Sequence, residues 1–431
     1  AGMFIKDAQK KIIEDCKKNG RVWDTGSHRH SYPHCWRCDS ALMNYATASW
    51  FVSIDRIKES MLKANGRTEW VPSHIRDGRF GRWLENARDW AISRNRFWGT
   101  PLPVWKSEDG DVWCFGSVSE LEEASGEKIT DLHKHFVDPL VIEKNGKTYR
   151  RVPEVLDCWF ESGSMPYAQE HYPFENKERF EANFPADFIC EGLDQTRGWF
   201  YTLAVLGSAL FDTPAFNNCV VNGLILAEDG KKMSKRLKNY PDPNEMLNKY
   251  GADAVRLYML NSPAVRGEDL RFTEKGLVET TRQQLLPLWN ALVFLSTYAK
   301  IDGWDPSPEN LSVKNRNPLD RWILSRLHKL IAEVQKEMDG YDLNRSVAPF
   351  VGFIDLLTNW YIRRSRRRFW KAGQGHDKRE AYATLYTVLF EFSKLIAPFI
   401  PYIADGIFRT LRHDTDHQSV HLAFFPEAHT V

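Results

Sequence analysis

Two lysines three positions apart, Lys232 and Lys235, have the clearest capacity for chemistry in this chain. They follow an apolar run, 219–227, that predicts a buried strand, and the turn signal Glu228-Asp229-Gly230 places them on a loop beyond its carboxyl end. Ligands of open α/β sheets bind at that edge. Lysine is a mobile point charge that can follow phosphate oxygens as charge shifts during a reaction. The loop, with Ser234 between the lysines, therefore predicts a phosphate site; the alternative is a solvated basic hairpin.

A second group of polar residues begins where the expected strand 188–190 ends. Two carboxylates and an amide at this strand-to-helix turn could hold an ammonium group and ribose hydroxyls, and they belong to Glu191, Asp194 and Gln195. Trp199 would add an apolar wall. The alternative is a capped helix start with a tryptophan in the core.

The segment 157–164 ends another expected strand, 153–159, in a similar way. Trp159 could form a second pocket wall or pack in the core, and Gly163 would let the backbone turn. Two strand ends that each combine tryptophan, acid and glycine favour a small-molecule pocket at the sheet edge.

Cys35 and Cys38 form a CxxC pair flanked by His28, His30 and His34. They would provide half of a tetrahedral zinc site, and the chain has no second CxxC to complete it. A histidine could close the site, but a packed, reduced turn is the favoured interpretation.

The run 360–371 places five arginines among aromatic residues. Such surfaces suit RNA through phosphate contacts and base stacking. A continuous helix would point these arginines all around its circumference, so some are expected to pair with carboxylates instead. The candidates for RNA contact are Arg363, Arg364, Arg366, Arg367 and Trp370.

Composition indicates a folded enzyme of two or three domains. The 431 residues carry 58 basic and 57 acidic side chains, so RNA contact would need local patches rather than a global field. Seven scattered cysteines do not form a secreted disulfide pattern. No signal peptide or membrane-length apolar run is found in the sequence, and a cytoplasmic location without membrane contact is expected.

The elements expected around these residues change type along the chain. An amphipathic helix over the first twenty residues is followed by alternating strands and helices to about residue 260, which predicts a parallel sheet. Residues 106–150 look like an inserted, loop-rich module. Beyond about residue 280 only helices are expected, including one that begins at Asn317 and ends at Gly340 and one with a capping-box start at Asp377 and Glu380.

With these motifs in order, the chain resembles the class I aminoacyl-tRNA synthetases, and within them the isoleucyl family. The match covers nearly the whole chain and rests on HSYPHCWRC at 30–38, DWAISRNRFWGTPLPVW at 89–105, DCWFESGSMPYA at 157–168, FPADFICEGLDQTRGWF at 184–200, NGLILAEDGKKMSKRLKNYPDP at 222–243 and GADAVRLY at 251–258. Arg236 and the NYPDP segment resemble the eukaryotic-type branch, which some bacteria also carry.

The resemblance implies the second half of a Rossmann-like α/β catalytic domain followed by an α-helical bundle. Residues 1–50 would rejoin the catalytic core after an editing insertion. The catalytic half would span 51–265, with the KMSKR loop at 232–236. A stem-contact and linker region would span 266–310, and an anticodon-binding helical bundle 311–431.

The resemblance also implies a two-step reaction. Isoleucine attacks the α-phosphate of Mg²⁺-bound ATP, and the acyl group then moves to the terminal adenosine of tRNA(Ile). Lys232, Ser234 and Lys235 would be catalytic, and ATP would also meet Met233, Asn222 and Gly223. The aminoacyl-adenylate would be held by Trp159, Glu191, Gly192, Asp194, Gln195 and Trp199. A monomer is expected.

The chain departs from the family in two respects. No HIGH-type sequence is found in it, and neither is the editing domain. The chain is therefore expected to be a C-terminal portion of a synthetase that is inactive in adenylation alone. The missing partners of Cys35 and Cys38 would lie upstream. The alternatives are a tRNA-binding fragment or paralogue without catalysis, and a valine-specific relative.

Overall fold

The computed structural model describes residues 2–35, 38–43, 45–234, 238–311, 317–373 and 375–430. The chain divides into two units, 1–49 and 50–431. In the first unit, α1 (Ile5–Lys18) is the expected amphipathic helix, and Gly20 follows it with a positive φ of 65°. A short turn beyond it is closed by a bridge between His34 and Ala41.

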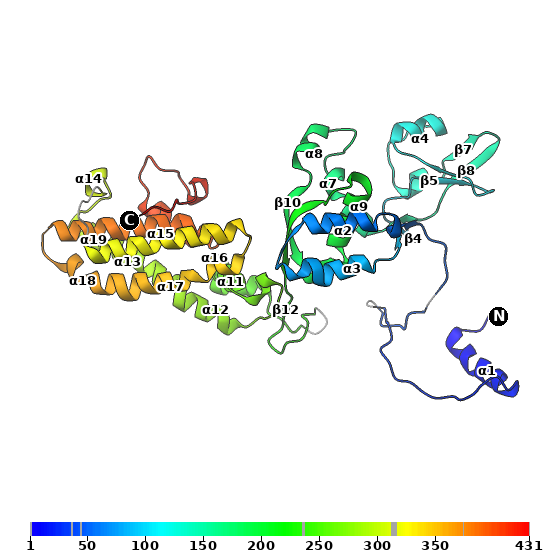
Figure 1. Cartoon of the computed structure of the whole chain (residues 1–431), viewed down its shortest axis with the longest axis horizontal. Helices are drawn as coiled ribbons and strands as arrows, with labels where there is room; N and C mark the ends of the chain where they lie inside the picture. The colour runs from blue at the N-terminus through cyan, green and yellow to red at the C-terminus, as the bar shows by residue number, and fades with distance from the viewer. Residues whose placement is uncertain are drawn as a thin grey trace. The chain divides into compact units, whose positions relative to one another are not determined.

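A three-stranded parallel sheet is the centre of the α/β part of the chain, as expected. Its strands are β2 (Glu69–Val71), β10 (Ala186–Gly192) and β11 (Phe216–Asn222), in the order β10-β11-β2. Helices α2 (Lys58–Arg67), α3 (Gly81–Glu85) and α9 (Trp199–Phe211) lie beside it (Figure 1). Their shared core includes the buried rings of Trp70, Phe80, Phe200 and Phe216. The burial of these rings holds the sheet and helices together.

Two strand expectations are wrong in extent. The run 219–227 is two strands, β11 and β12 (Ile225–Leu226), because Gly223 and Leu224 interrupt it. The run 153–159 contains only β9 (Val155–Leu156), which pairs antiparallel with β4 (Ser93–Arg94) outside the parallel sheet. A helix, α6 (Cys158–Gly163), begins where the rest of that strand was expected.

The inserted module has more structure than a loop-rich segment. It is an antiparallel sheet of β5 (Val104–Ser107), β6 (Val112–Cys114), β7 (Val141–Lys144) and β8 (Lys147–Arg151), in the order β6-β5-β8-β7. Helices α4 (Val118–Ser125) and α5 (Lys134–Val137) accompany it. A separate core, with Trp105 and Tyr149 buried, shows why the module folds despite its polar composition.

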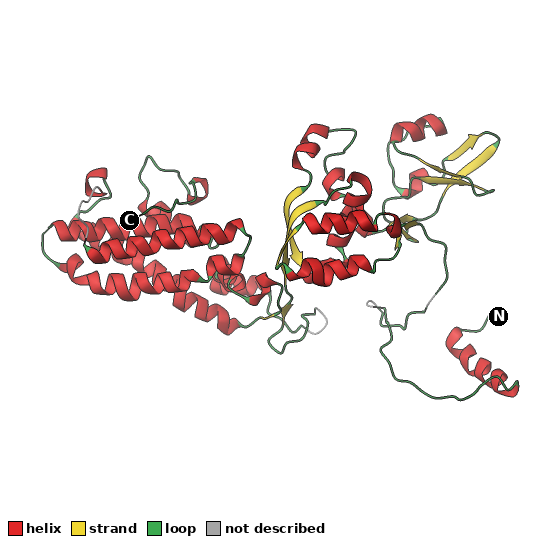
Figure 2. Cartoon of the chain, in the orientation of Figure 1, coloured by secondary structure: helices red, strands yellow, loops and turns green. Residues whose placement is uncertain are grey.

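Beyond β13 (Leu270–Arg271), the described elements are helical (Figure 2). The long helices of the bundle are α13 (Leu286–Asp302), α15 (Pro318–Asp339), α19 (His376–Ile396) and α20 (Pro401–Leu411). The Asn317 side chain caps α15 by accepting from Leu319 N at 2.9 Å, which confirms the predicted start. Between them, α17 (Pro349–Asp355) continues through a wider π-helical segment into α18 (Arg363–Trp370).

The start of α19 corrects the capping-box prediction. Its N-cap position is Gly375, and no side chain caps it. Asp377 and Glu380 instead face Arg368, at 2.8 and 3.7 Å. The domain boundaries assigned by resemblance stay predictions.

Candidate functional site

The carboxyl edge of the parallel sheet brings two of the predicted segments together. β10 and β11 run in register, so that Glu191 lies beside Val221 and Gly192 beside Asn222. Glu191 is exposed where β10 ends. The Asn222 amide donates to Cys190 Sγ at 3.2 Å, while its Oδ1 is buried without a hydrogen-bond partner among the described residues. This edge therefore offers both a carboxylate and an unsatisfied amide oxygen.

Three of the predicted site residues meet around Gly198, between the end of β10 and α9. A Cβ at this glycine would lie 2.6 Å from Gln195 Oε1 and 3.2 Å from the Trp159 ring, so only a glycine allows both groups to approach. Gln195 Oε1 accepts from Trp199 N at 3.0 Å, and the Trp199 indole donates to Ser162 O at 3.0 Å. The structure thus brings Trp159, Gln195 and Trp199 together, as the sequence predicted.

The two tryptophans differ in burial. Trp159 exposes 41% of its surface, so it is not a core residue. Trp199 is half-buried and packs on the core under the sheet. Gly163 allows the approach of α6 to α9, because a Cβ there would lie 3.0 Å from both Leu206 and Thr202. Trp159 can therefore offer an open ring face to a ligand.

Asp194 completes the polar side of this corner. It is exposed and accepts from Gln195 Nε2 at 3.2 Å. Its Oδ1 is also the nearest atom, at 2.8 Å, to a Cβ added at Gly192. The turn 191–195 thus holds two exposed carboxylates and the amide that contacts Trp199.

The lysine loop extends from β12 as a short hairpin. Lys232 bridges to Leu226, and Ala227 N donates to Lys231 O at 2.9 Å. The Lys232 side chain is exposed and has no ion pair with any described residue, whereas its neighbour Lys231 pairs with Asp229 at 3.1 Å. Met233 and Ser234 are half-buried. Lys235 and Arg236 lie outside the described residues.

Asn239 organises this loop, and sequence reasoning did not single it out. Its Oδ1 accepts from Ser234 N at 3.0 Å, and its Nδ2 donates to Lys232 O at 3.2 Å. An asparagine that satisfies the backbone of its own turn is a known signal, which the NYPDP segment carried. The contact fixes the backbone on both sides of Met233.

Gly223 follows β11 directly, and its backbone approaches the segment around Ala264 and Glu268. A Cβ at this position would lie 1.8 Å from Glu268 O. Gly223 N donates to Ala264 O at 2.7 Å. The predicted ATP residue Gly223 is thus required for backbone approach.

In the CxxC segment, Cys35 is half-buried, and Trp36 and Arg37 lie outside the described residues. Cys35 N donates to Ser40 O at 2.8 Å, and Cys38 Sγ lies 3.0 Å from Ser40 Oγ. Cys38 is exposed, and hydrogen bonds from Ser40 lower the pKa of its thiol to about 7. Within the described ranges, no three His, Cys, Asp or Glu side chains are placed to hold a metal ion.

The five arginines of the run 360–371 differ in burial and in their partners. Arg368 is buried and binds Asp320 through two 2.7 Å hydrogen bonds. The other four arginines are exposed and have no carboxylate partner in the described part of the chain; they are Arg363, Arg364, Arg366 and Arg367. The Arg364 guanidinium lies 3.7 Å from the centre of the Trp360 ring. Trp370 is exposed and donates to Tyr298 Oη at 2.8 Å.

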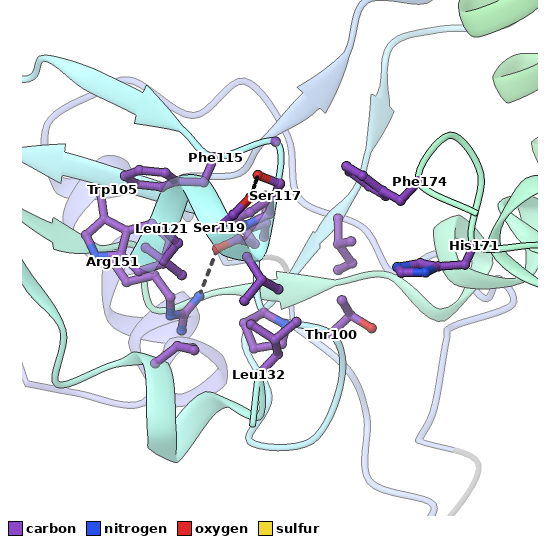
Figure 3. Close-up of a pocket in the computed structure, with 17 residues that line it drawn as sticks. Thr100, Trp105, Phe115, Ser117, Ser119, Leu121, Leu132, Arg151, His171 and Phe174 are labelled. Atoms are coloured by element: carbon purple, nitrogen blue, oxygen red, sulfur yellow. Dashed lines mark hydrogen bonds between the residues drawn. The ribbon is translucent and has the colours of Figure 1, made fainter. Parts of the chain in front are cut away.

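An apolar cavity of about 540 Å³ lies in the inserted module, where no site was predicted (Figure 3). Trp105, Phe115 and Leu132 line it, together with Phe174 from beyond α7 (Met165–Ala168). The Arg151 side chain at its base is fully buried, and its donors are directed to Asp138 and to the carbonyls of Leu102 and Glu154. Arg151 thus serves the module's own structure.

Comparison with known proteins identifies the class. Residues 7–271 match the family described as tRNA synthetases class I (I, L, M and V), and residues 320–431 match the anticodon-binding domain of tRNA ligases. The first match covers more than half of the chain, so the chain belongs to the class I tRNA synthetases. Among the described residues, no helix has the length and apolar character needed to cross a membrane.

Among individual relatives, the chain is similar to several isoleucine–tRNA ligases. The chain is 57% identical to the isoleucine–tRNA ligase of Protochlamydia amoebophila and 58% identical to that of Chlamydia trachomatis, over 99% of its own length and 41% of theirs. It is 56% identical to that of Treponema denticola, over 99% of its length and 40% of the relative's. The chain thus spans about two fifths of these curated relatives. The eukaryotic-type branch stays a prediction, since these relatives are bacterial.

Solved structures support the fold. A Mycobacterium tuberculosis methionyl-tRNA synthetase in complex with methionyl-adenylate gives a TM-score of 0.64 at 17% identity, covering 90% of this chain and 68% of that one. An Agrobacterium radiobacter LeuRS in a ternary complex with tRNA and LeuAMS gives 0.56 at 18% identity, covering 83% and 45%. The Rossmann-like α/β fold and the helical domain after it are thereby confirmed.

Proposed function

We propose that the full-length protein is an isoleucine–tRNA ligase, which activates isoleucine with ATP and transfers it to tRNA(Ile) in the cytoplasm. The observation that carries this proposal is the corner around Gly198, where Trp159, Gln195 and Trp199 meet at the edge of the parallel sheet. Two indole rings beside an amide suit a small aliphatic amino acid. The names of the relatives favour isoleucine over valine.

In the proposed first step, an isoleucine carboxylate oxygen attacks the α-phosphorus of ATP, and the bond to the pyrophosphate oxygen breaks. Negative charge builds on the departing pyrophosphate, where an unpaired cation is most useful. Lys232 supplies such a cation, and Asn239 fixes the backbone around it. Lys235 is proposed to act with it, Ser234 to assist and Met233 to adjoin the nucleotide. Mg²⁺ would arrive bound to the ATP phosphates.

The carboxylates at the sheet edge are proposed to hold the aminoacyl-adenylate. Glu191 and Asp194 are exposed and can accept from the isoleucine ammonium group or from ribose hydroxyls. Gly192 keeps the backbone open beside them, while Asn222 and Gly223 border the nucleotide from β11. The unsatisfied Asn222 Oδ1 supports this assignment, because a buried amide oxygen without a partner is costly.

In the proposed second step, the 2′-hydroxyl of the terminal adenosine attacks the acyl carbon and AMP leaves. The exposed face of α18 is proposed to contact the tRNA through Arg363, Arg364, Arg366, Arg367 and Trp370. Its residues lie within the segment that matches the anticodon-binding family. Zinc at Cys35 and Cys38 is not part of this proposal, since two thiols make only half a site; the reduced turn stays the prediction. The monomeric state also stays a prediction.

Paired lysine variants of the full-length protein test the proposal. Lys232→Ala should lower isoleucine-dependent ATP–pyrophosphate exchange about 10- to 1000-fold, as expected for the loss of one charge-stabilising group. Isoleucine binding should hardly change. Lys231→Ala is the matched control, because Lys231 already pairs with Asp229 and should leave exchange intact. Equal losses in both variants would contradict the assignment of Lys232.

The amino acid and the activity of the isolated chain need separate measurements. ATP–pyrophosphate exchange by the full-length protein should be faster with isoleucine than with valine. One methylene contributes only about 1–3 kcal/mol to the discrimination between the two amino acids, a limit best known from this very family. A preference for valine would reverse the substrate assignment. The 431-residue chain alone is expected to show no exchange, and robust exchange by it would contradict that expectation.

A further inference from the structure

A second cation without a carboxylate partner lies beside the lysine loop, on β13. β12 pairs with β13 in parallel, so that Leu226 lies beside Arg271. On its other side, Leu226 bridges to Lys232 in the antiparallel hairpin. Residues paired directly across neighbouring strands place their side chains on the same face of a sheet. Arg271, Leu226 and Lys232 therefore share one face, and the backbones of the two cations are two strand spacings, or roughly 10 Å, apart.

The residues on either side of Arg271 fix the direction of its side chain. Side chains alternate along a strand, so both neighbours of Arg271 point to the opposite face. Leu270 is buried there, and the Phe272 ring lies edge-on to Tyr258 with ring centres 5.6 Å apart. The backbone that follows is held by Thr273 N, which donates to Tyr258 Oη at 3.3 Å. The packing of β13 therefore keeps Arg271 on the exposed face.

The Arg271 guanidinium reaches the lysine hairpin itself. A Cβ added at Gly230, in the turn of the hairpin, would lie 3.1 Å from Arg271 Nε and 3.3 Å from its Nη2. Gly230 has a φ of 79°, a conformation that favours glycine. The turn that leads into Lys232 thus lies directly against the guanidinium, and a glycine in this turn leaves room for it.

Arg271 has no carboxylate partner among the residues that the structure describes, although acidic residues are close to it in the hairpin and in β13. Asp229 pairs with Lys231 at 3.1 Å, and Asp269 Oδ1 accepts from Leu224 N at 3.2 Å. The guanidinium of Arg271 is therefore able to donate to an anion from outside the chain. Its planar fork matches a phosphate group in two parallel hydrogen bonds, which a lysine cannot provide.

We propose that Arg271 is a further phosphate-binding residue of this site and binds the β- or γ-phosphate of ATP together with Lys232. The choice of ATP rests on the proposed function. Two cations on one face hold a polyphosphate from two sides, and they share the negative charge that builds on the departing pyrophosphate. Sequence reasoning did not single out Arg271, because its strand lies far along the chain from the KMSKR loop and only the pairing of β13 with β12 brings the two together.

Isoleucine-dependent ATP–pyrophosphate exchange by the full-length protein tests this role. Arg271→Ala should lower the exchange rate between about tenfold and 150-fold, the range for losing one hydrogen bond to a charged group. The KM for isoleucine should not change. Arg271→Lys keeps the charge without the fork, so its rate should lie between those of the wild type and Arg271→Ala. Arg282→Ala is the matched control, because Arg282 is also an exposed arginine but belongs to the helical segment Thr281–Leu285.

Transfer of preformed isoleucyl-adenylate to tRNA(Ile), measured in a single turnover, separates phosphate binding from a structural role. Pyrophosphate has left before this step, so Arg271→Ala should transfer at the wild-type rate. An equal loss of exchange and transfer in Arg271→Ala would overturn the inference, since it would indicate a role in folding or RNA contact. Wild-type exchange rates in Arg271→Ala, or an equal loss in Arg282→Ala, would overturn it too. These results reject this inference alone, whereas absent exchange in the wild type would reject the proposed function.

Discussion

Replacing Arg368 by leucine should unfold the helical bundle locally. The guanidinium makes two 2.7 Å hydrogen bonds to Asp320 and a third at 2.8 Å to the backbone carbonyl of Asp377. It also forms ion pairs with the carboxylates of Asp377 at 2.8 Å and Glu380 at 3.7 Å. Asp320 is fully buried, and Tyr361 also donates to it at 2.7 Å. Removing the arginine would leave this carboxylate buried with only a neutral partner.

The size of the effect follows from that burial. Breaking a buried ion pair by removing one partner costs about 3–5 kcal/mol, more than the usual effect of a surface substitution, about 0.5 kcal/mol. Although burial opposes the charged form, hydrogen bonds to Asp320 raise the pKa of Arg368, so the arginine stays charged at any ordinary pH. The destabilisation should therefore change little with pH near neutrality.

Hydrogen exchange followed by mass spectrometry measures this locally. Peptides from α15 and α19 should lose protection in Arg368→Leu, and the free energy of opening should fall by the amount above. Arg367→Leu is the matched control, since it makes the same chemical change one residue away on the exposed face. Equal protection in the two variants would refute the assignment of Arg368 as the structural arginine.

Three further predictions concern other parts of the chain. In thermal denaturation, Gly223→Ala should lower the free energy of unfolding by at least about 1–3 kcal/mol, because its Cβ would meet Glu268 O. Gly352→Ala is the control: this glycine lies in α17 with open space around it, and the substitution should raise the free energy of unfolding by about 0.5–1 kcal/mol. Burial and the charge of His429 lower the pKa of His328 below 6.5, so folding favours the neutral form of this histidine. The free energy of unfolding should therefore be highest above pH 6.5 and should fall as the pH drops below that value. In urea titrations, His328→Gln should reduce this loss of stability. Trp199→Ala in the full-length protein should raise the KM for isoleucine more than it lowers kcat, and a loss confined to kcat would contradict a role in the pocket wall.

Features set by neighbouring residues could be predicted from the sequence. The stripe Ile323, Leu327, Leu330 and Val334 is buried along α15, and Asn317 caps that helix as its position suggested. These signals are local, since a cap and a 3.6-residue period need only a few adjacent side chains. The alternation of strand-like and helical runs is also read from adjacent residues, and it indicated a parallel sheet, although not the pairing of β11 with the distant β2.

Features set by distant contacts could not be predicted. The pattern at Asp377 and Glu380 suggested a capping box, but Arg368 requires these carboxylates because its burial is costly without them. The inserted module was expected to be loop-rich, since its apolar residues are sparse along the sequence and form a core only when four strands bring them together. Only the folded chain shows such pairings.

The site shows the same division. Residue types and order were enough to place Gln195 and Trp199 at the edge where β10 ends, because strand ends in a parallel sheet meet there. Trp159 reaches them from α6, which follows the antiparallel strand β9 and not a strand of the parallel sheet. The closeness of their approach depends on Gly198 and Gly163, which permit the Trp159 ring and α9 to pack without an intervening Cβ. Because a glycine has no side chain, the sequence does not indicate which glycines permit such close packing.

Whether a lysine or arginine can bind a ligand depends on whether a carboxylate already pairs with it. Folding determines that pairing, and the position of the residue in the sequence does not. Lys231 and Lys232 are adjacent, yet Asp229 neutralises only the first. Arg367 and Arg368 are also adjacent, yet only Arg368 turns inward to a carboxylate. In each pair one cation has a carboxylate partner, and the other remains available to a phosphate group. A basic run in a sequence therefore indicates where a phosphate contact can form, whereas the partner of each side chain determines which residue makes it.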